Sequence, residues 1–67
     1  MSLMRVDRWL WYARFFKTRS LATNAVRSGR VRVDGERAKA AREVSIGNAL
    51  SIHRGDSITD VCVLKIP

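Results

Sequence analysis

The sequence predicts an α+β domain, with two N-terminal helices packed on a small, mostly antiparallel sheet of short strands. Two observations indicate this fold class. Apolar residues recur at helical spacing in residues 1–28, and after Gly29 they alternate with polar residues, as in a half-buried strand. The whole chain, residues 1–67, is expected to be a single domain, because it is close to the smallest size at which one hydrophobic core sustains a fold.

The first helix is predicted over residues 5–16. Val6, Leu10 and Ala13 recur at helical spacing, and Trp9 lies beside them. Asp7 falls in the first turn, where a negative charge suits the positive end of the helix dipole. We therefore expect Asp7 to have a structural role.

The second helix is predicted over residues 19–28. Thr18 is the expected N-cap, because its hydroxyl can accept a hydrogen bond from an unpaired backbone N–H, and Gly29 is the expected residue just beyond the C-terminus. Arg19, Thr23 and Arg27 share one face, opposite a face of small apolar residues. These small residues favour close packing on the first helix, which leaves the basic face to solvent or to a ligand.

Short strands are predicted after Gly29. Val31 and Val33 alternate with arginines, and the sequence at residues 34–35, Asp-Gly, is typical of a tight turn. Residues 36–47 are less regular, and a second turn is expected at residues 47–48. Leu50 and Ile52 alternate with polar residues, and a third turn at residues 54–56 leads to a final strand over about 58–66.

The net positive charge comes entirely from the first half of the chain. The protein has 13 Lys and Arg residues against 6 Asp and Glu residues, a net charge of +7. Residues 1–32 contain eight cations and one acid, whereas residues 33–67 contain five of each, so the whole excess lies in the first half. Such a field attracts a polyanion, and the guanidinium of Arg suits phosphate. A role in solubility alone does not require this one-sidedness.

Five aromatic residues lie between these cations: Trp9, Trp11, Tyr12, Phe15 and Phe16. Nucleic-acid-binding proteins use this combination to join phosphate contacts with base stacking. Trp9 and Phe16 flank the apolar stripe of the first helix and are expected in the core. Trp11 and Phe15 fall on the opposite side, where one of them is expected to be exposed, and Trp11 is the better candidate for stacking on a base.

The residues indicate no catalytic, metal or cofactor site. His53 and Cys62 are single and far apart, so neither a nucleophile–base pair nor a cysteine-based zinc site is expected. His53 is interpreted as a surface or edge residue and Cys62 as a small core residue. No apolar run reaches the roughly 20 residues that span a bilayer. We therefore expect a cytoplasmic, monomeric protein that is not an enzyme and has no cofactor, membrane partner or small-molecule substrate.

Several segments together resemble a known RNA-binding family. Residues 5–10 (RVDRWL), 17–22 (KTRSLA), 29–35 (GRVRVDG) and 44–50 (VSIGNAL) are similar to the domain named after ribosomal small-subunit protein S-four, also called the alpha-L motif. The resemblance covers about residues 5–55. Residues 9–11 and 14–19 look most like the ribosome-associated heat-shock protein fifteen group. The resemblance implies that members of that group recognise a large ribosomal subunit stalled with a nascent chain.

The resemblance also implies an RNA-binding surface on the two helices. Its residues lie at the start of the first helix, around the start of the second helix and along its exposed face and exit: Arg5, Arg8, Lys17, Thr18, Arg19, Ser20, Thr23, Arg27 and Arg30. Thr18 can alternatively be fully occupied as a cap. Leu21 stands where the family often has an acid, so the reciprocal capping box is missing. The basic C-terminal extension usual in the heat-shock group does not follow Pro67, so the sequence is either a piece of a longer chain or a shorter relative.

The expected function is binding of structured RNA, with ribosomal RNA of the large subunit as the partner in a ribosome-associated or stress-related role. The deep, narrow major groove of A-form RNA hinders side-chain readout, so phosphate geometry and unpaired loops are expected to carry recognition. Two alternatives stay open. The chain can be the RNA-targeting domain of a larger RNA-modifying enzyme such as a pseudouridine synthase, or its basic face can dock on an acidic protein or a membrane surface.

Overall fold

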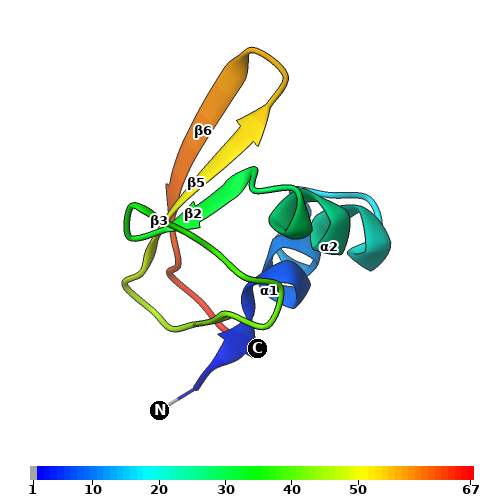
Figure 1. Cartoon of the computed structure of the whole chain (residues 1–67). Helices are drawn as coiled ribbons and strands as arrows, with labels where there is room; N and C mark the ends of the chain where they lie inside the picture. Colours follow the sequence, from blue (N-terminus) through cyan, green and yellow to red (C-terminus); the bar gives the residue numbers. More distant parts are fainter. Residues whose placement is uncertain (1) are drawn as a thin grey trace.

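Two helices and two antiparallel sheets make up the computed structural model, which describes residues 2–67. A four-stranded sheet has the order β3-β2-β5-β6, and β1 pairs with β4 in a separate two-stranded sheet. In Figure 1 the helices lie side by side next to β2, and the β5–β6 hairpin projects from the body. In chain order the elements are β1 (Met4–Arg5), α1 (Val6–Tyr12), α2 (Arg19–Arg27), β2 (Val31–Val33), β3 (Glu36–Arg37), β4 (Glu43–Val44), β5 (Ala49–Arg54) and β6 (Ser57–Cys62).

The predicted α+β class is confirmed, since two N-terminal helices pack on antiparallel strands. One hydrophobic core joins them, and it draws on α1, α2, the four-stranded sheet and β4. The small residues of α2 are buried in it, as the spacing of the second helix predicts. Neither helix is long and apolar enough to cross a membrane, in the part of the chain that the structure describes. The buried apolar side chains are Val6, Trp9, Leu10, Ala22, Ala25, Val26, Val31, Val33, Ala38, Val44, Leu50, Ile52 and Val63.

The first helix is shorter than the range of 5–16 that the sequence predicts, and this prediction was wrong at both ends. Arg5 belongs to β1, and α1 ends at Tyr12. The backbone of Arg14 is left-handed, with φ +65°. Its amide donates to the carbonyl of Trp11 at 3.0 Å, and the next amide, of Phe15, reaches back to the carbonyl of Leu10 at 3.0 Å. These two bonds form a Schellman motif, which usually has glycine at the left-handed position, so a sequence with arginine there carries no stop signal.

The second helix and its two end signals are confirmed. The Thr18 hydroxyl accepts a hydrogen bond from the amide of Leu21 at 3.1 Å, so Thr18 is the N-cap. At the other end Gly29 is left-handed, with φ +81°, and its amide donates to the carbonyl of Val26 at 3.1 Å. A Cβ on Gly29 would lie 2.9 Å from Nε of Arg37, so glycine is favoured there by both backbone conformation and space.

The predicted strand over residues 58–66 was wrong in its second half. β6 ends at Cys62, and the chain then runs back to the helices. The amide of Val63 donates to the carbonyl of Asn48 at 2.9 Å, and the carbonyl of Lys65 accepts a hydrogen bond from the indole Nε1 of Trp9 at 2.9 Å. The indole N–H of a buried tryptophan needs a hydrogen-bond acceptor, and residues 63–67 supply one to α1 instead of extending the hairpin.

Cys62 is exposed, so its prediction as a core residue was wrong. Side chains alternate between the two faces of a strand. Val61 and Val63 lie on the side that packs on the core, and Cys62 therefore points the other way, opposite exposed Ala49 in the register of β5 and β6. His53 is partly exposed on β5, which is an inner strand, so it lies at the surface but not at the sheet edge.

Candidate RNA-binding surface

Asp7 connects α1 with α2 beneath the arginines. Its carboxylate is 1% exposed. Arg5 donates to it from Nε and Nη2 at 3.2 and 3.0 Å, the amide of Arg8 donates at 2.7 Å, and the hydroxyl of Thr23 in α2 donates at 3.0 Å. A bidentate ion pair holds the plane of the guanidinium, and the Arg5 side chain is still 45% exposed. The predicted structural role of Asp7 is confirmed, and Arg5 is presented to solvent in a fixed orientation.

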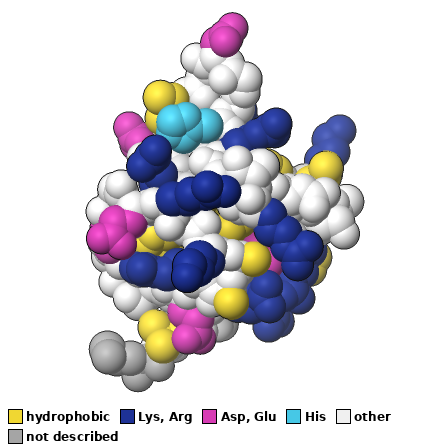
Figure 2. Space-filling model, viewed as in Figure 1, with side chains coloured by type: hydrophobic (Ala, Val, Ile, Leu, Met, Phe, Trp, Pro, Cys, Tyr) yellow, Lys and Arg dark blue, Asp and Glu magenta, His cyan; other side chains and the backbone are white. Residues whose placement is uncertain are grey.

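Six of the nine residues predicted to bind RNA line two adjoining hollows where α1 meets α2, and we call these six the helix surface. Both hollows share Arg5 and Arg19, and acidic Asp7 and Glu43 lie among the cations. Figure 2 shows Lys and Arg side chains gathered over the helices on the right of the molecule, with further cations towards its middle. The members of the helix surface are Arg5, Arg8, Arg19, Ser20, Thr23 and Arg27.

Thr23 has a different role from the arginines around it. Its hydroxyl lies 3.0 Å from Oδ2 of Asp7 and 3.0 Å from the carbonyl of Arg19. A hydroxyl has one hydrogen to donate, and both of these acceptors are within the protein. Thr23 is therefore placed to hold the helices together, and only its oxygen lone pairs remain for a ligand.

The other three predicted residues, Lys17, Thr18 and Arg30, do not line these two hollows. Lys17 lines a second cleft, described below. Thr18 is exposed, and its oxygen is engaged as the cap of α2, although its hydroxyl hydrogen can still be donated. Arg30 lies between α2 and β2, where its carbonyl accepts a hydrogen bond from the amide of His53 at 2.8 Å. Of the nine predicted residues, six thus line the two hollows of the helix surface, and Lys17 lines a different cleft.

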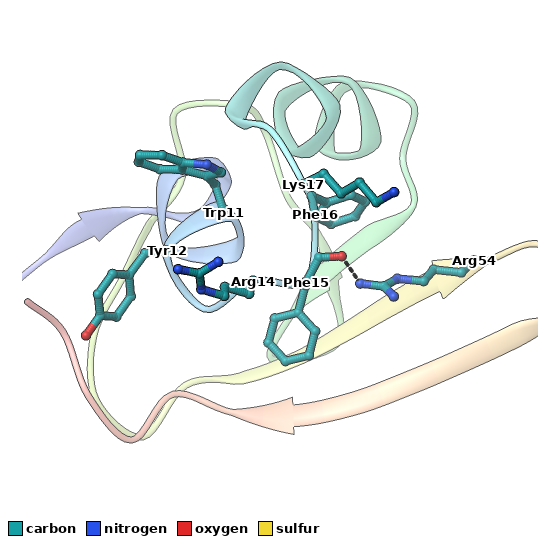
Figure 3. A pocket seen from close by; sticks show the side chains of 7 residues that line it. All are labelled: Trp11, Tyr12, Arg14, Phe15, Phe16, Lys17 and Arg54. Carbon is teal, nitrogen blue, oxygen red and sulfur yellow. Dashed lines mark hydrogen bonds between the residues drawn. The ribbon is translucent and has the colours of Figure 1, made fainter.

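The second cleft has a volume of about 680 Å³ and lies beyond the C-terminal end of α1. We call it the aromatic cleft, and Figure 3 shows the side chains around it. Its rings are Trp11, Tyr12, Phe15 and Phe16, and its cations are Arg14, Lys17 and Arg54.

Arg54 reaches the aromatic cleft from the end of β5. It donates from Nη2 to the carbonyl oxygen of Phe15 (dashed in Figure 3). Its guanidinium carbon lies 5.1 Å from the ring centroid of Phe16 and 5.9 Å from that of Phe15, which is cation–π distance. Sequence reasoning missed Arg54 because it belongs to the charge-neutral half. It missed Arg14 because the expected helix runs through it.

The aromatic residues are distributed largely as predicted. Trp9 is buried, as expected, with only 5% of its surface exposed. Trp11 is 44% exposed, which confirms that one of the two rings opposite the core stripe is at the surface. Phe15 is half-buried, with its centroid 5.9 Å from that of Trp9. Phe16 was expected in the core, but it is only partly buried there, because its other side faces the cleft.

Comparison with known proteins identifies the family. The family model of the S4 domain matches residues 4–50. The chain belongs to the S4 domain family. The solved structure of heat shock protein 15 from Vibrio cholerae, described as trimeric, superposes on this S4 domain with a TM-score of 0.90 and 42% sequence identity, and the match covers 98% of this chain and 67% of that one. The predicted family and fold are thereby confirmed.

Relatives of this S4 domain have two different names. The chain is 40% identical over 63 residues to the heat shock protein 15 homolog of Aeromonas salmonicida, a match that covers 94% of this chain and 48% of that protein. It is 38% identical over 63 residues to heat shock protein 15 of Escherichia coli, a match that covers 94% of this chain and 47% of that protein. The chain thus spans about half the length of these relatives. It is 38% identical over 64 residues to the RQC P-site tRNA stabilizing factor of Helicobacter pylori, covering 96% of this chain and 76% of that protein. The predicted likeness to the heat-shock group is confirmed.

Proposed function

We propose that this chain binds structured RNA through the helix surface, and that its target is ribosomal RNA of the large subunit in a ribosome-associated, stress-related role. The observation that carries the proposal is that four arginines from β1, α1 and α2 converge around adjoining hollows: Arg5, Arg8, Arg19 and Arg27. Arginine forks match phosphate oxygens, and Asp7 holds the fork of Arg5 in place. Guanidinium groups presented from neighbouring elements suit the shape of a folded RNA backbone more than a base sequence.

The names of the relatives support a ribosomal partner. One group is named for stabilizing a tRNA in the P site, which is a site of the ribosome, and the other is named as heat shock proteins. These names favour a non-catalytic RNA-binding role over the RNA-modifying enzyme. We accordingly propose a cytoplasmic location, because that is where a ribosome-binding role would be carried out. The Vibrio cholerae relative is described as trimeric, whereas we expect this chain to be a monomer. Analytical ultracentrifugation of the protein in solution would test that expectation.

The salt dependence of binding tests the helix surface. If about four to six phosphates are neutralised, the logarithm of affinity for a fully paired RNA should fall against the logarithm of salt concentration with a slope of about −3 to −5. Arg19→Ala and Arg27→Ala should each weaken binding and make the slope shallower by about one unit. Unchanged affinity and slope in both variants would refute the proposed surface.

Arg32→Ala is a matched control for these two variants. Arg32 is exposed and alternates with buried Val31 and Val33, so it lies on the face of the sheet turned away from the core. Its removal subtracts the same unit of charge from the protein. We expect a much smaller change in slope than for Arg19→Ala, because Arg32 lies outside the helix surface.

Crosslinking in cells tests the identity of the RNA. The RNA bound to the full-length protein is sequenced after crosslinking. Recovery of large-subunit ribosomal RNA would support the proposal. Recovery of messenger RNA or free tRNA alone would refute the ribosomal part and leave RNA binding by the helix surface intact.

A further inference from the structure

The aromatic cleft is a feature that binding of a paired RNA by the helix surface does not explain. Four of the five aromatic residues of the chain line it, and only Trp9 is placed elsewhere, in the core. Trp11 and Tyr12 are 44% and 40% exposed. Phe15 and Phe16 also pack against the core, but Trp11 and Tyr12 do not, and exposed rings beside an open cleft point to binding.

The charge of the cleft narrows the class of ligand. Three of its lining residues are cations, Arg14, Lys17 and Arg54, and none is an acid. The helix surface differs in this respect, because Asp7 and Glu43 lie among its arginines. Positive charge without a compensating acid, next to exposed rings, suits a ligand that has both a planar aromatic part and an anionic part. The volume of about 680 Å³ is ample for such a group.

The walls of the cleft are held in place by contacts distant in sequence. Figure 3 shows Trp11, Tyr12 and Arg14 on one side of the Phe15 backbone and Arg54 on the other. The hydrogen bond from Arg54 to the Phe15 carbonyl attaches the β5–β6 hairpin to the loop that follows α1. The left-handed backbone of Arg14 sets the course of that loop.

We propose that the aromatic cleft binds an unpaired nucleotide of the RNA, with the base stacked on Trp11 and the phosphate held by Arg14 and Lys17. This inference rests on the proposed function, namely that the chain binds RNA. Lys17 is followed directly by Thr18 and by Arg19 of the helix surface, so one RNA strand can pass from one site to the other. A stem on the helix surface would then have its neighbouring unpaired nucleotide in the cleft. Splayed bases stacked on aromatic side chains are the usual means of recognising unpaired RNA.

The test uses two RNAs with the same stem, one a blunt duplex and the other a hairpin whose loop contains a single 2-aminopurine. Stacking on an indole quenches the fluorescence of this base. The wild-type protein should quench it. Trp11→Ala should abolish the quenching and weaken hairpin binding by about 5- to 150-fold, the range found for loss of one base–aromatic stack, and leave affinity for the duplex unchanged.

Three further variants make the result specific. Leu64→Ala removes another exposed apolar side chain, 78% exposed and outside the cleft, and should change neither affinity nor quenching. Arg14→Gln should weaken binding of the hairpin but not of the duplex, which keeps the proposal testable if Trp11→Ala fails to fold. Arg19→Ala should weaken binding of both RNAs, because it acts through the helix surface.

The outcomes separate the two proposals. Unchanged hairpin affinity with persistent quenching in Trp11→Ala would overturn the proposal for the cleft, while a weakened Arg19→Ala would still support the helix surface. Failure of the wild-type protein to bind either RNA would overturn the proposed function itself. Displacement of the hairpin loop by a polyglutamate peptide, but not by unlabelled single-stranded RNA, would assign the cleft to an acidic protein segment and would also overturn the inference.

Discussion

Replacing Asp7 by asparagine removes one buried charge and leaves the size of the side chain unchanged. Oδ1 of Asp7 accepts from Nε of Arg5 and from the amide of Arg8, and Oδ2 accepts from Nη2 of Arg5 and from the hydroxyl of Thr23. Whichever way the asparagine amide turns, one of these two pairs of donors faces its nitrogen. The variant therefore loses about two hydrogen bonds to a charged group.

Hydrogen bonds to charged groups contribute about 1.5–3 kcal/mol each, so two of them set an upper limit of about 3–6 kcal/mol. The loss should be smaller here, because Arg5 is 45% exposed and water can solvate its released charge. Thr23 can also keep its bond to the carbonyl of Arg19. We expect Asp7→Asn to lower the free energy of unfolding by about 2 kcal/mol, which corresponds to a fall in Tm of about 8–16 °C for a domain of this size.

Urea unfolding followed by far-UV circular dichroism measures this loss, with Asp56→Asn as the matched control. Asp56 is exposed in the turn between β5 and β6, so the same chemical change there should stay within about 0.5 kcal/mol of the wild type. If Asp7→Asn is no less stable than Asp56→Asn, the reasoning that Asp7 holds the two helices together is refuted. A double-mutant cycle with Thr23→Val should show a coupling of about 0.5–2 kcal/mol.

Thr18→Ala should destabilise the fold by about 1 kcal/mol, because α2 loses its N-cap. Thr18→Asp should keep the cap but weaken RNA binding through its negative charge. If both variants are equally destabilised in urea unfolding, the capping role of Thr18 is contradicted. Arg14→Gly should leave stability unchanged or raise it by up to about 1 kcal/mol, because φ +65° strains an L-residue but not glycine; a marked fall in Tm would show that side-chain contacts of Arg14 hold the turn. Gly29→Ala should cost about 1–2 kcal/mol in urea unfolding, since φ is +81° and the new Cβ would crowd Arg37, and wild-type stability would contradict this.

Local signals were sufficient for the second helix and for the turn that follows it. Thr18 and Gly29 act on backbone groups within one helical turn, so the ends of α2 could be predicted from the sequence, and the structure has Thr18 as the N-cap and Gly29 in the left-handed conformation. Asp34-Gly35 likewise joins β2 to β3 in a two-residue turn, with both residues at positive φ. The end of α1 was missed because the left-handed position carries arginine, which has no preference for it.

The sequence alone determined the fold class and the basic first half of the chain, because periodicity, end signals and charge are properties of neighbouring residues. Its motifs indicated the family, and the resemblance to that family implied the arginines of the helix surface. Tertiary structure decided which of these groups are free to act. The Thr23 hydroxyl donates to Asp7, the indole of Trp9 donates to the carbonyl of Lys65, and Arg54 of the β5–β6 hairpin donates to the carbonyl of Phe15. Each of these contacts joins residues at least 16 positions apart, and no local preference specifies which distant segments meet when a core closes.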